Sequence, residues 1–328
     1  MTIPAGTRVD DYELLEHLAD GAGAEVHRAV RTPTGEIVAV KVPFVDSLSD
    51  ASRARQWRRE VQLTARLHHD RIVRRVDLDR HKSRPYEVFE YVGGGSVRTW
   101  LMPGVGLPVL QTVSWGRQLA EALGYLHGHG YVHGDVKPDN LLVTDDLDVK
   151  LTDFGAATKM GRFPLTPPRQ VLEIAEGTPE YLSPEQIQGQ ELGARSDVYA
   201  WGIVMYELLT GECPFTGADP VEVMESHLRR SPKPIRDLRP EVSPGLEAVV
   251  LTAMRRQADQ RQPDMASVIA DLDRADGLDP ATRDLGPEPE LAIQPLAGSA
   301  ALWKFVAAVA TCWLVVVAAV LAVTAIAR

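Results

Sequence analysis

The sequence predicts an α+β fold with two lobes, in which a β-rich small lobe with one main helix precedes a mostly helical large lobe. Short apolar runs that alternate like strands dominate up to Val92, whereas helical periodicities dominate from Val109 onward. The glycines Gly93–Gly95 stand at this change. Near the C-terminus, the 23 residues Phe305–Ala327 carry no charge, which predicts one transmembrane helix in addition to the two lobes.

The composition indicates a globular protein and disfavours one class of partner. Hydrophobic residues make up 45% of the 328 residues and charged residues 24%, which is typical of globular chains. The net charge of −10 disfavours a nucleic-acid-binding surface. Cys213 and Cys312 are far apart in the sequence and differ in setting, so they predict neither a disulfide framework nor a zinc cluster.

The small lobe is predicted to span residues 12–92. Its helix is expected over Ser52–Leu67, a segment rich in arginine. The turn Ala19–Gly23, which contains glycine, joins the first two strands. Backbone amides in such a turn can approach a phosphate closely, although most glycine-containing turns have no ligand-binding role. Strands are predicted over Tyr12–Leu18, Ala24–Arg31, Ile37–Val42, Ile72–Leu78 and Tyr86–Val92.

Lys41 is the first candidate functional residue. It shares the face of its strand with the apolar Ile37 and Ala39, so its ammonium group needs an anionic partner. Glu60 in the following helix is the candidate partner. The alternatives are a lysine that snorkels at the strand end and a Glu60 that pairs locally with its arginine neighbours.

The large lobe is predicted to span residues 96–275. A short hairpin is expected over Leu141–Val143 and Val149–Thr152, and a long loop over Ala156–Gly177, which contains three prolines. Helices are predicted over Val109–His129, Glu180–Gln188, Ser196–Leu209, Val221–Arg229, Pro244–Arg256 and Met265–Leu272.

The segment Tyr131–Asn140, YVHGDVKPDN, concentrates polar chemistry in ten residues. The spacing of Asp135, Lys137 and Asn140 lets their side chains turn toward one point, whereas an ordinary polar loop after a helix is the simpler alternative. Asp153, beside a flexible glycine, can be aimed as a metal ligand, or it can serve as a turn or helix cap.

In this order the motifs resemble those of the eukaryotic-type Ser/Thr protein kinases, in particular the membrane-bound bacterial members. The resemblance covers the chain from Tyr12 to Leu272 and implies the bilobal protein-kinase fold. It is carried by VAVK ending at Lys41, HDRIV, VFEYV, HGDVKPDN, DFG, GTPEYLSPEQ and SDVYAWGIVMYELLTGECPF. It also implies a buried pair between Glu185 and Arg261.

The resemblance implies that Lys41 holds the α- and β-phosphates of ATP and that Glu60 holds Lys41. Aligned on the family's glycine loop, the chain has Ala19, Gly21 and an alanine at the third position, so only the middle glycine is retained. Asp20 adds a carboxylate beside the triphosphate position, which is unfavourable unless it points to solvent. These departures predict weaker binding of ATP than is usual in the family.

The adenine site follows from the same resemblance. Val26, Ala39 and Leu142 are expected to sandwich the ring, and the backbone from Glu90 to Val92 to bond its edge. Phe89 is expected to be the gatekeeper.

The catalytic and metal-binding roles are implied in the same way. Asp135 is expected to accept or orient the proton of the substrate hydroxyl, and Lys137 to neutralise the γ-phosphoryl group, with Thr178 bonded near both. Asp153 is expected to bind a Mg²⁺ or Mn²⁺ ion that bridges the phosphates, and Asn140 a second such ion. Protein serine and threonine residues are the implied substrates, and the function implied is membrane-associated bacterial signalling.

Two alternatives to a protein kinase are a pseudokinase scaffold and a small-molecule phosphotransferase. The five groups that the core reaction needs are present, which argues against a pseudokinase. The HGD sequence resembles the catalytic loop of aminoglycoside and choline phosphotransferases, because Gly134 stands where most protein kinases carry arginine. Those enzymes lack the GTPEYLSPE and SDVYAWG segments. Without an arginine at Gly134, activity is not expected to require phosphorylation of the activation loop.

The C-terminal part is predicted to anchor the protein. Residues 276–300 are rich in Pro, Gly and Asp and predict a juxtamembrane linker, and residues 303–327 predict the transmembrane helix. No N-terminal apolar stretch resembles a signal peptide, so the kinase domain is expected in the cytoplasm, on a single-pass, tail-anchored protein of the cell membrane. Homodimerisation is left open.

Overall fold

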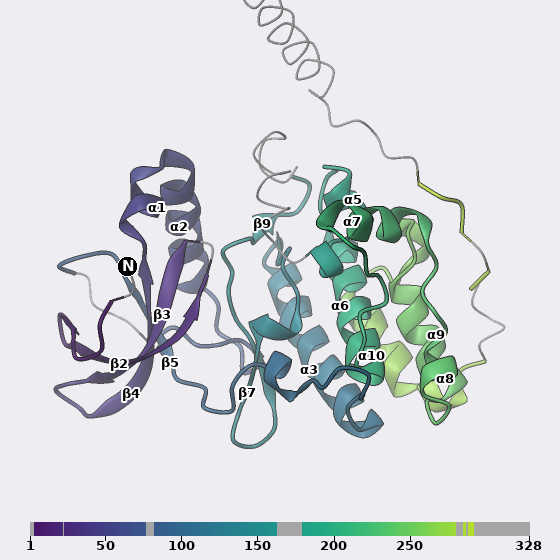
Figure 1. Cartoon of the computed structure of the whole chain (residues 1–328), viewed down its shortest axis with the longest axis horizontal. Coiled ribbons are helices and arrows are strands. Elements are labelled where there is room, and N and C mark those ends of the chain that lie inside the picture. The colour runs from purple at the N-terminus through teal and green to yellow at the C-terminus, as the bar shows by residue number, and fades with distance from the viewer. Residues whose placement is uncertain are drawn as a thin grey trace, which may run out of the picture.

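The protein folds into two lobes joined side by side (Figure 1). The computed structural model describes residues 3–21, 23–76, 82–162, 179–279, 285–286 and 288–291. The β-rich small lobe lies on the left of Figure 1 and the helical large lobe on the right. This arrangement agrees with the predicted bilobal fold.

The small lobe is built on a five-stranded antiparallel sheet in the order β1-β2-β3-β4-β5. Alternation along the strands buries one face, where Leu14, Ala29, Val40 and Val88 form a compact core. The opposite face is left for the site described below. The strands are β1 (Arg8–Val9), β2 (Tyr12–Asp20), β3 (Ala24–Arg31), β4 (Glu36–Pro43) and β5 (Glu87–Glu90).

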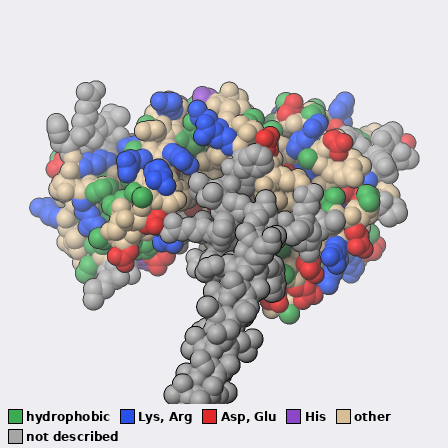
Figure 2. All heavy atoms as spheres, turned by 90° about the horizontal axis from the view of Figure 1, so that it is seen from above, with side chains coloured by type: hydrophobic (Ala, Val, Ile, Leu, Met, Phe, Trp, Pro, Cys, Tyr) green, Lys and Arg blue, Asp and Glu red, His purple; other side chains and the backbone are tan. Residues whose placement is uncertain are grey.

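Two helices follow β4, namely α1 (Val45–Ser49) and α2 (Ala51–Thr64). The Asp50 side chain accepts hydrogen bonds from the first backbone amides of α2 and so caps it. Glu60 and Leu63 of α2 are buried. The exposed side of the same helix carries arginines, and Lys and Arg side chains gather over the small lobe in the view from above (Figure 2).

The large lobe surrounds α6 (Ala194–Thr210), whose residues from Ser196 to Thr210 are all buried. A helix that is buried all round needs close neighbours on every face. Gly116 of α3 lies against Met205, and Trp201 donates a hydrogen bond to the Gly116 carbonyl at 2.8 Å. The helices are α3 (Val109–Gly128), α5 (Pro184–Ile187), α6, α7 (Pro220–Arg229), α8 (Ile235–Leu238), α9 (Pro244–Ala253) and α10 (Met265–Asp273).

Short elements complete the large lobe. Two small antiparallel pairs join β6 to β9 and β7 to β8. The strands are β6 (Tyr131–Val132), β7 (Leu141–Val143), β8 (Val149–Leu151) and β9 (Thr158–Lys159). Turns of 3-10 helix cover Val97–Trp100, Pro138–Asn140, Pro179–Tyr181, Ala258–Gln260 and Ala275–Gly277.

The expected pair between Glu185 and Arg261 is confirmed. Both side chains are buried, and the guanidinium group donates to the two carboxylate oxygens at 2.8 and 3.0 Å. Arg261 also bonds three backbone carbonyls. Removing one partner of such a pair would leave a buried charge, which costs about 3–5 kcal/mol. The pair therefore fixes the segment around α5 to the base of the large lobe.

Two predicted elements are wrong. The described part of Ile72–Leu78 forms isolated bridges and no strand, because Ile72 pairs with Leu151 of β8 and Arg75 with Phe89 of β5. This segment is thus shared between the two lobes. The helix predicted over Glu180–Gln188 is broken into a 3-10 turn and α5, because Ser183 starts a new helix as its N-cap and Pro184 lacks the amide that a continuous helix needs.

Several short elements were not predicted, namely β1, α1, β6, β9 and α8. Each spans two to five residues, too few for a periodic pattern to be read in the sequence.

Part of the predicted juxtamembrane linker packs on the large lobe. The carboxylate of Glu288 accepts from the backbone amide of Arg256 at 2.6 Å and pairs with Arg255 at 3.3 Å. The amide of Leu291 bonds the carbonyl of Leu228. Among the described residues, no helix has the length and apolarity that a bilayer span requires. The predicted transmembrane helix, residues 303–327, lies outside the described residues.

Candidate active site

Lys41 of β4 joins the two lobes. Its ammonium nitrogen lies 2.5 Å from a carboxylate oxygen of Glu60 in α2 and 3.0 Å from one of Asp153, which belongs to the large lobe. The predicted Lys41–Glu60 contact is therefore present, and neither snorkelling nor local pairing of Glu60 with Arg58 or Arg59 describes it. One cation thus connects a strand, a helix and the loop after β8.

Lys41, Glu60 and Asp153 shift one another's pKa. Lys41 lowers the pKa of Asp153 to about 2, against the opposing effect of burial. Burial favours the neutral form of Lys41, but Asp153 and Glu60 outweigh it and raise the pKa of Lys41 above its ordinary value. Burial raises the pKa of Glu60, and Lys41 opposes that rise. Lys41 and Asp153 are consequently charged at neutral pH.

Asp153 has a backbone conformation that few residues other than glycine adopt, with φ of 60°. Such a left-handed residue costs about 1–2 kcal/mol, which the ion pair with Lys41 helps to offset. The neighbouring Phe154 is buried and meets the ring of His133 edge to face at 5.2 Å. The Gly155 carbonyl accepts a hydrogen bond from Gln56 of α2 at 2.7 Å. This contact fastens the segment to the small lobe's helix, and sequence reasoning did not identify Gln56.

The predicted adenine-site residues share one face of the small-lobe sheet. Val26 lies opposite Lys41 and Ala39 lies opposite Phe89 in the strand register, and directly opposed residues point to the same face. Lys41 and Ala39 are two residues apart and share that face too. Leu142 belongs to β7 of the large lobe and forms a bridge with Ser96, close to the connection between the lobes. All four apolar side chains are only partly buried.

The connection between the lobes is held closely. Glu90 accepts from the backbone amide of Arg74 at 2.8 Å and from Lys150 at 2.6 Å. Among the described residues, the amide of Val92 makes no hydrogen bond. Gly94 packs so tightly that a Cβ atom there would lie 2.4 Å from the Val143 carbonyl oxygen. Gly94, within the glycine run at the lobe boundary, therefore allows close packing against β7.

The turn between β2 and β3 begins at Ala19 and Asp20, which pair with Val26 and Glu25. The amide of Gly21 bonds the Ala24 carbonyl at 2.8 Å. The Asp20 side chain is 60% exposed and contacts His17. The carboxylate that was expected to disturb a triphosphate is therefore turned to solvent and to a histidine.

Asp135, Lys137 and Asn140 converge as predicted from their spacing. Lys137 pairs with the Asp135 carboxylate at 2.8 Å. The Asn140 amide donates to the same carboxylate at 3.0 Å and to the Asp135 carbonyl at 2.8 Å. The Asp135 side chain is still 31% exposed, so it can be approached by a hydroxyl group from solvent.

The buried carboxylate of Asp197 supports this loop from α6. It accepts from the amides of His133 and Gly134 at 2.8 and 3.0 Å and contacts the His127 ring at 2.7 Å. Although burial opposes ionisation, these donors hold the pKa of Asp197 below its usual range. The His133 ring is fully buried and contacts the Thr152 carbonyl at 3.1 Å. His133 therefore supports the backbone and has no access to a substrate.

Gly134 adopts a left-handed conformation with φ of 76°, and its carbonyl accepts from the Gln186 side chain at 2.8 Å. Sequence reasoning missed Gln186. It directly follows Ser183-Pro184-Glu185, but only the fold brings it to the Tyr131–Asn140 loop. Thr178 lies outside the described residues, so its predicted position near Asp135 and Lys137 stays a prediction.

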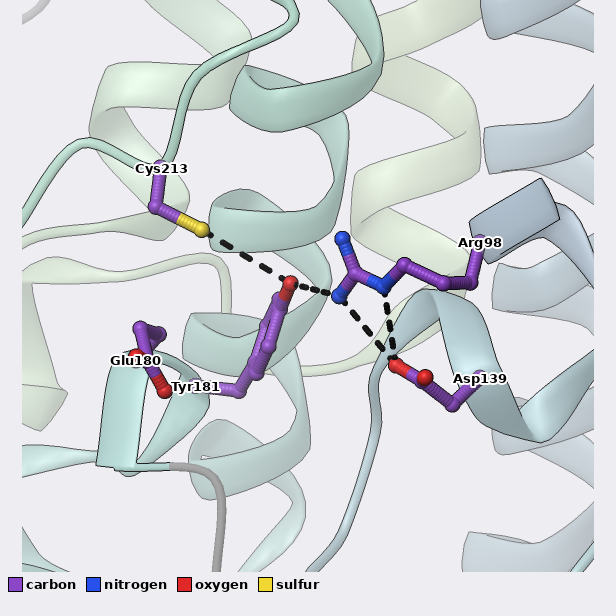
Figure 3. A pocket seen from close by; sticks show the side chains of 5 residues that line it. All are labelled: Arg98, Asp139, Glu180, Tyr181 and Cys213. Atoms are coloured by element: carbon purple, nitrogen blue, oxygen red, sulfur yellow. Dashed lines mark hydrogen bonds and ion pairs between the residues drawn. The ribbon is translucent and has the colours of Figure 1, made fainter. Parts of the chain in front are cut away.

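A cavity of about 310 Å³ opens beside the catalytic loop (Figure 3). Arg98 reaches across it, donating to Asp139 at 3.1 and 3.2 Å, to Glu207 at 2.6 Å and to the Tyr181 hydroxyl. Cys213 lies at the far side, 3.7 Å from the same hydroxyl, and burial raises the pKa of its thiol to about 12. Arg98 was not predicted, because nothing in its local sequence marks it. It ties the start of the large lobe to α6 and to the segment before α5.

Comparison with known proteins agrees with this geometry. A profile of the protein kinase domain matches residues 12–271. The chain belongs to the protein kinase family. It is 38% identical over 266 residues to a probable serine/threonine-protein kinase of Streptomyces coelicolor, covering 80% of this chain and 39% of that protein. It is 38% identical over 269 residues to the serine/threonine-protein kinase PknB of Mycolicibacterium smegmatis, covering 81% and 43%.

PknB of Mycobacterium tuberculosis is 37% identical over 284 residues, which cover 85% of this chain and 45% of that kinase. The chain thus matches about two fifths of the length of these curated relatives. The family and the Ser/Thr class of its relatives agree with the resemblance drawn from the motifs.

Replacing Lys41 with Met is expected to raise the pKa of Asp153 from about 2 by at least about one unit. The attraction of Lys41 is what lowers it, and burial alone raises it. Carboxyl-carbon NMR titration of the Asp153 signal measures this shift. Lys137→Met is the matched control, because Lys137 pairs with Asp135. An equal shift in both variants, or none in Lys41→Met, would contradict the assignment.

Proposed function

We propose that this protein is a Ser/Thr protein kinase that transfers the γ-phosphoryl group of ATP to serine and threonine hydroxyls of proteins. The observation that carries the proposal is the meeting of Lys41, Glu60 and Asp153 within 3.0 Å, next to a loop where Asp135, Lys137 and Asn140 converge. Membership of the protein kinase family and relatives named Ser/Thr kinases support the reaction class.

The charge of each residue in the site determines its proposed role. Lys41 supplies a permanent cation for the α- and β-phosphates, and Glu60 holds it in place. Asp135 takes the proton of the attacking hydroxyl, whose oxygen forms the new bond to phosphorus as the bond to ADP breaks. Lys137 offsets charge on the transferred group. Val26, Ala39 and Leu142 give the adenine an apolar setting.

The donor set fits Mg²⁺ or Mn²⁺ near Asp153 and Asn140. Hard divalent cations prefer carboxylate and amide oxygens, and Asp153 is ionised well below neutral pH. Such an ion would neutralise phosphate charge during the transfer. The Asn140 nitrogen already bonds Asp135, which leaves its carbonyl oxygen as the free ligand atom.

Incubation of the 328-residue chain with labelled ATP, Mg²⁺ and a generic basic protein is expected to label that protein on Ser or Thr. Lys41→Met and Asp153→Asn are each expected to lower the rate by at least about 100-fold. The first removes a cation that offsets phosphate charge, and the second removes the carboxylate that would hold the metal ion. Lys233→Met is the control, since Lys233 is an exposed lysine of the large lobe to which no role in the site is assigned.

Phosphorylation of small amino alcohols without protein labelling would favour the phosphotransferase alternative. ATP binding without any transfer would favour a pseudokinase scaffold. Labelling that persists in Lys41→Met would contradict the proposed roles.

We further propose that the kinase domain is held at the cytoplasmic face of a bacterial cell membrane by residues 303–327. The 23 uncharged residues Phe305–Ala327 support this location, since a helix of this length rises about 34 Å, more than the hydrocarbon core of a bilayer. Membrane-associated signalling and the option of a homodimer rest on the same segment.

Deleting residues 303–328 is expected to move the protein from the membrane pellet to the supernatant of fractionated cells, because the apolar segment supplies the insertion free energy. Replacing Leu314 and Val316 with Asp in the intact chain is a second variant that tests insertion without shortening it. A protein that stays in the pellet in both cases would contradict anchoring by this segment.

We also propose that activity is independent of a phosphate on the activation loop. Gly134 carries no cation, and the catalytic loop is held by the Asp197 carboxylate and the Gln186 amide. These contacts need no phosphate.

Phosphatase treatment is expected to leave kcat within about twofold of the untreated protein, since no described contact of the catalytic loop depends on phosphate. Thr158 and Thr166 are the hydroxyl groups in the predicted loop Ala156–Gly177 that could accept a phosphate. The double variant Thr158→Ala, Thr166→Ala is expected to behave in the same way. A loss of tenfold or more (about 1.4 kcal/mol) on treatment would contradict the proposal.

A further inference from the structure

Four side chains of types that can bind metals, namely His17, Asp20, Glu25 and His27, lie near the turn of the β2–β3 hairpin. None of them is assigned a role above. His17 lies opposite His27 and Asp20 lies opposite Glu25 in the strand register. Glu25 and His27 alternate with Val26, so they point to the face of the sheet opposite the adenine-site residues. The hairpin therefore carries two imidazoles and two carboxylates at one end of the sheet.

The contacts within this cluster are close. The His17 Nε2 atom lies 2.8 Å from Asp20 Oδ1, and the His27 Nε2 atom lies 3.1 Å from Glu25 Oε2. The two imidazole rings meet edge to face with centroids 5.4 Å apart. Ligand atoms of His17, Asp20 and Glu25 all lie within 4.8 Å of one another. The backbone amide of Ile3 also donates to Glu25, at 3.0 Å.

Burial makes the cluster unusual. His27 is 1% exposed and Glu25 3%. The Nε2 atom of His27 faces the Glu25 carboxylate, yet it makes no hydrogen bond of acceptable geometry in the structure. A buried nitrogen without a well-formed hydrogen bond costs up to about 1–3 kcal/mol, so this atom is a candidate for binding a metal ion.

We infer that this hairpin binds one transition-metal ion of the Zn²⁺ class through the compact group of His17, Asp20 and Glu25, with the neighbouring His27 as the fourth ligand. Two imidazoles with two carboxylates suit Zn²⁺, Co²⁺ or Ni²⁺, whereas Mg²⁺ and Ca²⁺ prefer oxygen ligands alone. Tetrahedral Zn²⁺ places its ligand atoms about 3.3 Å apart. His17 and Asp20 are exposed and can close the remaining gap, while Glu25 and His27 form the fixed half of the site.

The site is distinct from the Mg²⁺ position near Asp153, and it acts on the turn of the hairpin. Asp20 ends β2 and is paired with Glu25 of β3. An ion bound to both carboxylates therefore connects the two strands where the turn begins and ends. It also keeps the Asp20 carboxylate away from the face that receives the triphosphate. Binding therefore orders the turn without contacting ATP.

The test uses the 328-residue chain, treated with chelator and titrated calorimetrically with Zn²⁺ in excess Mg²⁺ and without nucleotide. One ion per chain is expected to bind and to raise Tm. His17→Ala and Asp20→Asn are each expected to weaken binding at least about tenfold, since ligand loss costs at least as much as loss of a supporting contact. Both residues are exposed, so these variants keep the fold. His129→Ala, an exposed histidine of the large lobe, is the matched control.

Two further measurements separate this site from adventitious binding. Co²⁺ is expected to give intense visible absorption bands of low coordination number in the wild type and weak ones in His27→Gln. Hydrogen exchange of the amides between residues 17 and 27 is expected to slow with Zn²⁺ in the wild type but not in Asp20→Asn. Absence of saturable binding, or equal affinity in the wild type, His17→Ala and Asp20→Asn, would overturn the inference.

Discussion

The site depends on one ammonium group, because Lys41 is the point at which three separate pieces of chain meet. Its two carboxylate partners come from α2 and from the loop after β8, and both lie within 3.0 Å. Without that cation, Glu60 would be a buried and unpaired carboxylate, and Asp153 would lose the attraction that lowers its pKa. A buried anion without a partner is expensive, so the two lobes are coupled through the charge of a single side chain.

The catalytic loop is held from behind by groups that do not react. Asp197 accepts two backbone amides and a histidine contact, and Gln186 bonds the Gly134 carbonyl. These bonds position the backbone on both sides of Asp135 while its carboxylate remains partly exposed. Rigid support with an accessible acceptor is what the proposed phosphoryl transfer needs, since such a reaction depends on positioning more than on covalent chemistry.

The β2–β3 hairpin serves two different faces of the small lobe. Val26 belongs to the face that carries Lys41, whereas Glu25 and His27 belong to the opposite, buried face. The period of two in a strand separates these environments within three residues. An ion bound on the face of Glu25 and His27 would thus influence the turn near the phosphates through the backbone alone.

The sequence by itself predicted the two lobes and the order of the main strands and helices, and the resemblance of its motifs to protein kinases named the candidate reacting groups. It could do so because long periodic segments and dense polar motifs are local signals. It could not decide whether Glu60 pairs with Lys41 or with Arg58 and Arg59, since that choice depends on how α2 is turned against the sheet. The assignment of Ile72–Leu78 failed for a similar reason, because its partners lie in two different sheets.

Tertiary structure alone revealed Gln56, Arg98 and Gln186, whose partners are 41 to 109 residues away in sequence. It also showed that residues 288–291 pack on the large lobe and that the glycines between the lobes serve close packing. Lys41 itself illustrates the division. The sequence identified it as a lysine in need of an anion, and only the folded chain determined that it has two, because burial and distance between remote segments are set by packing.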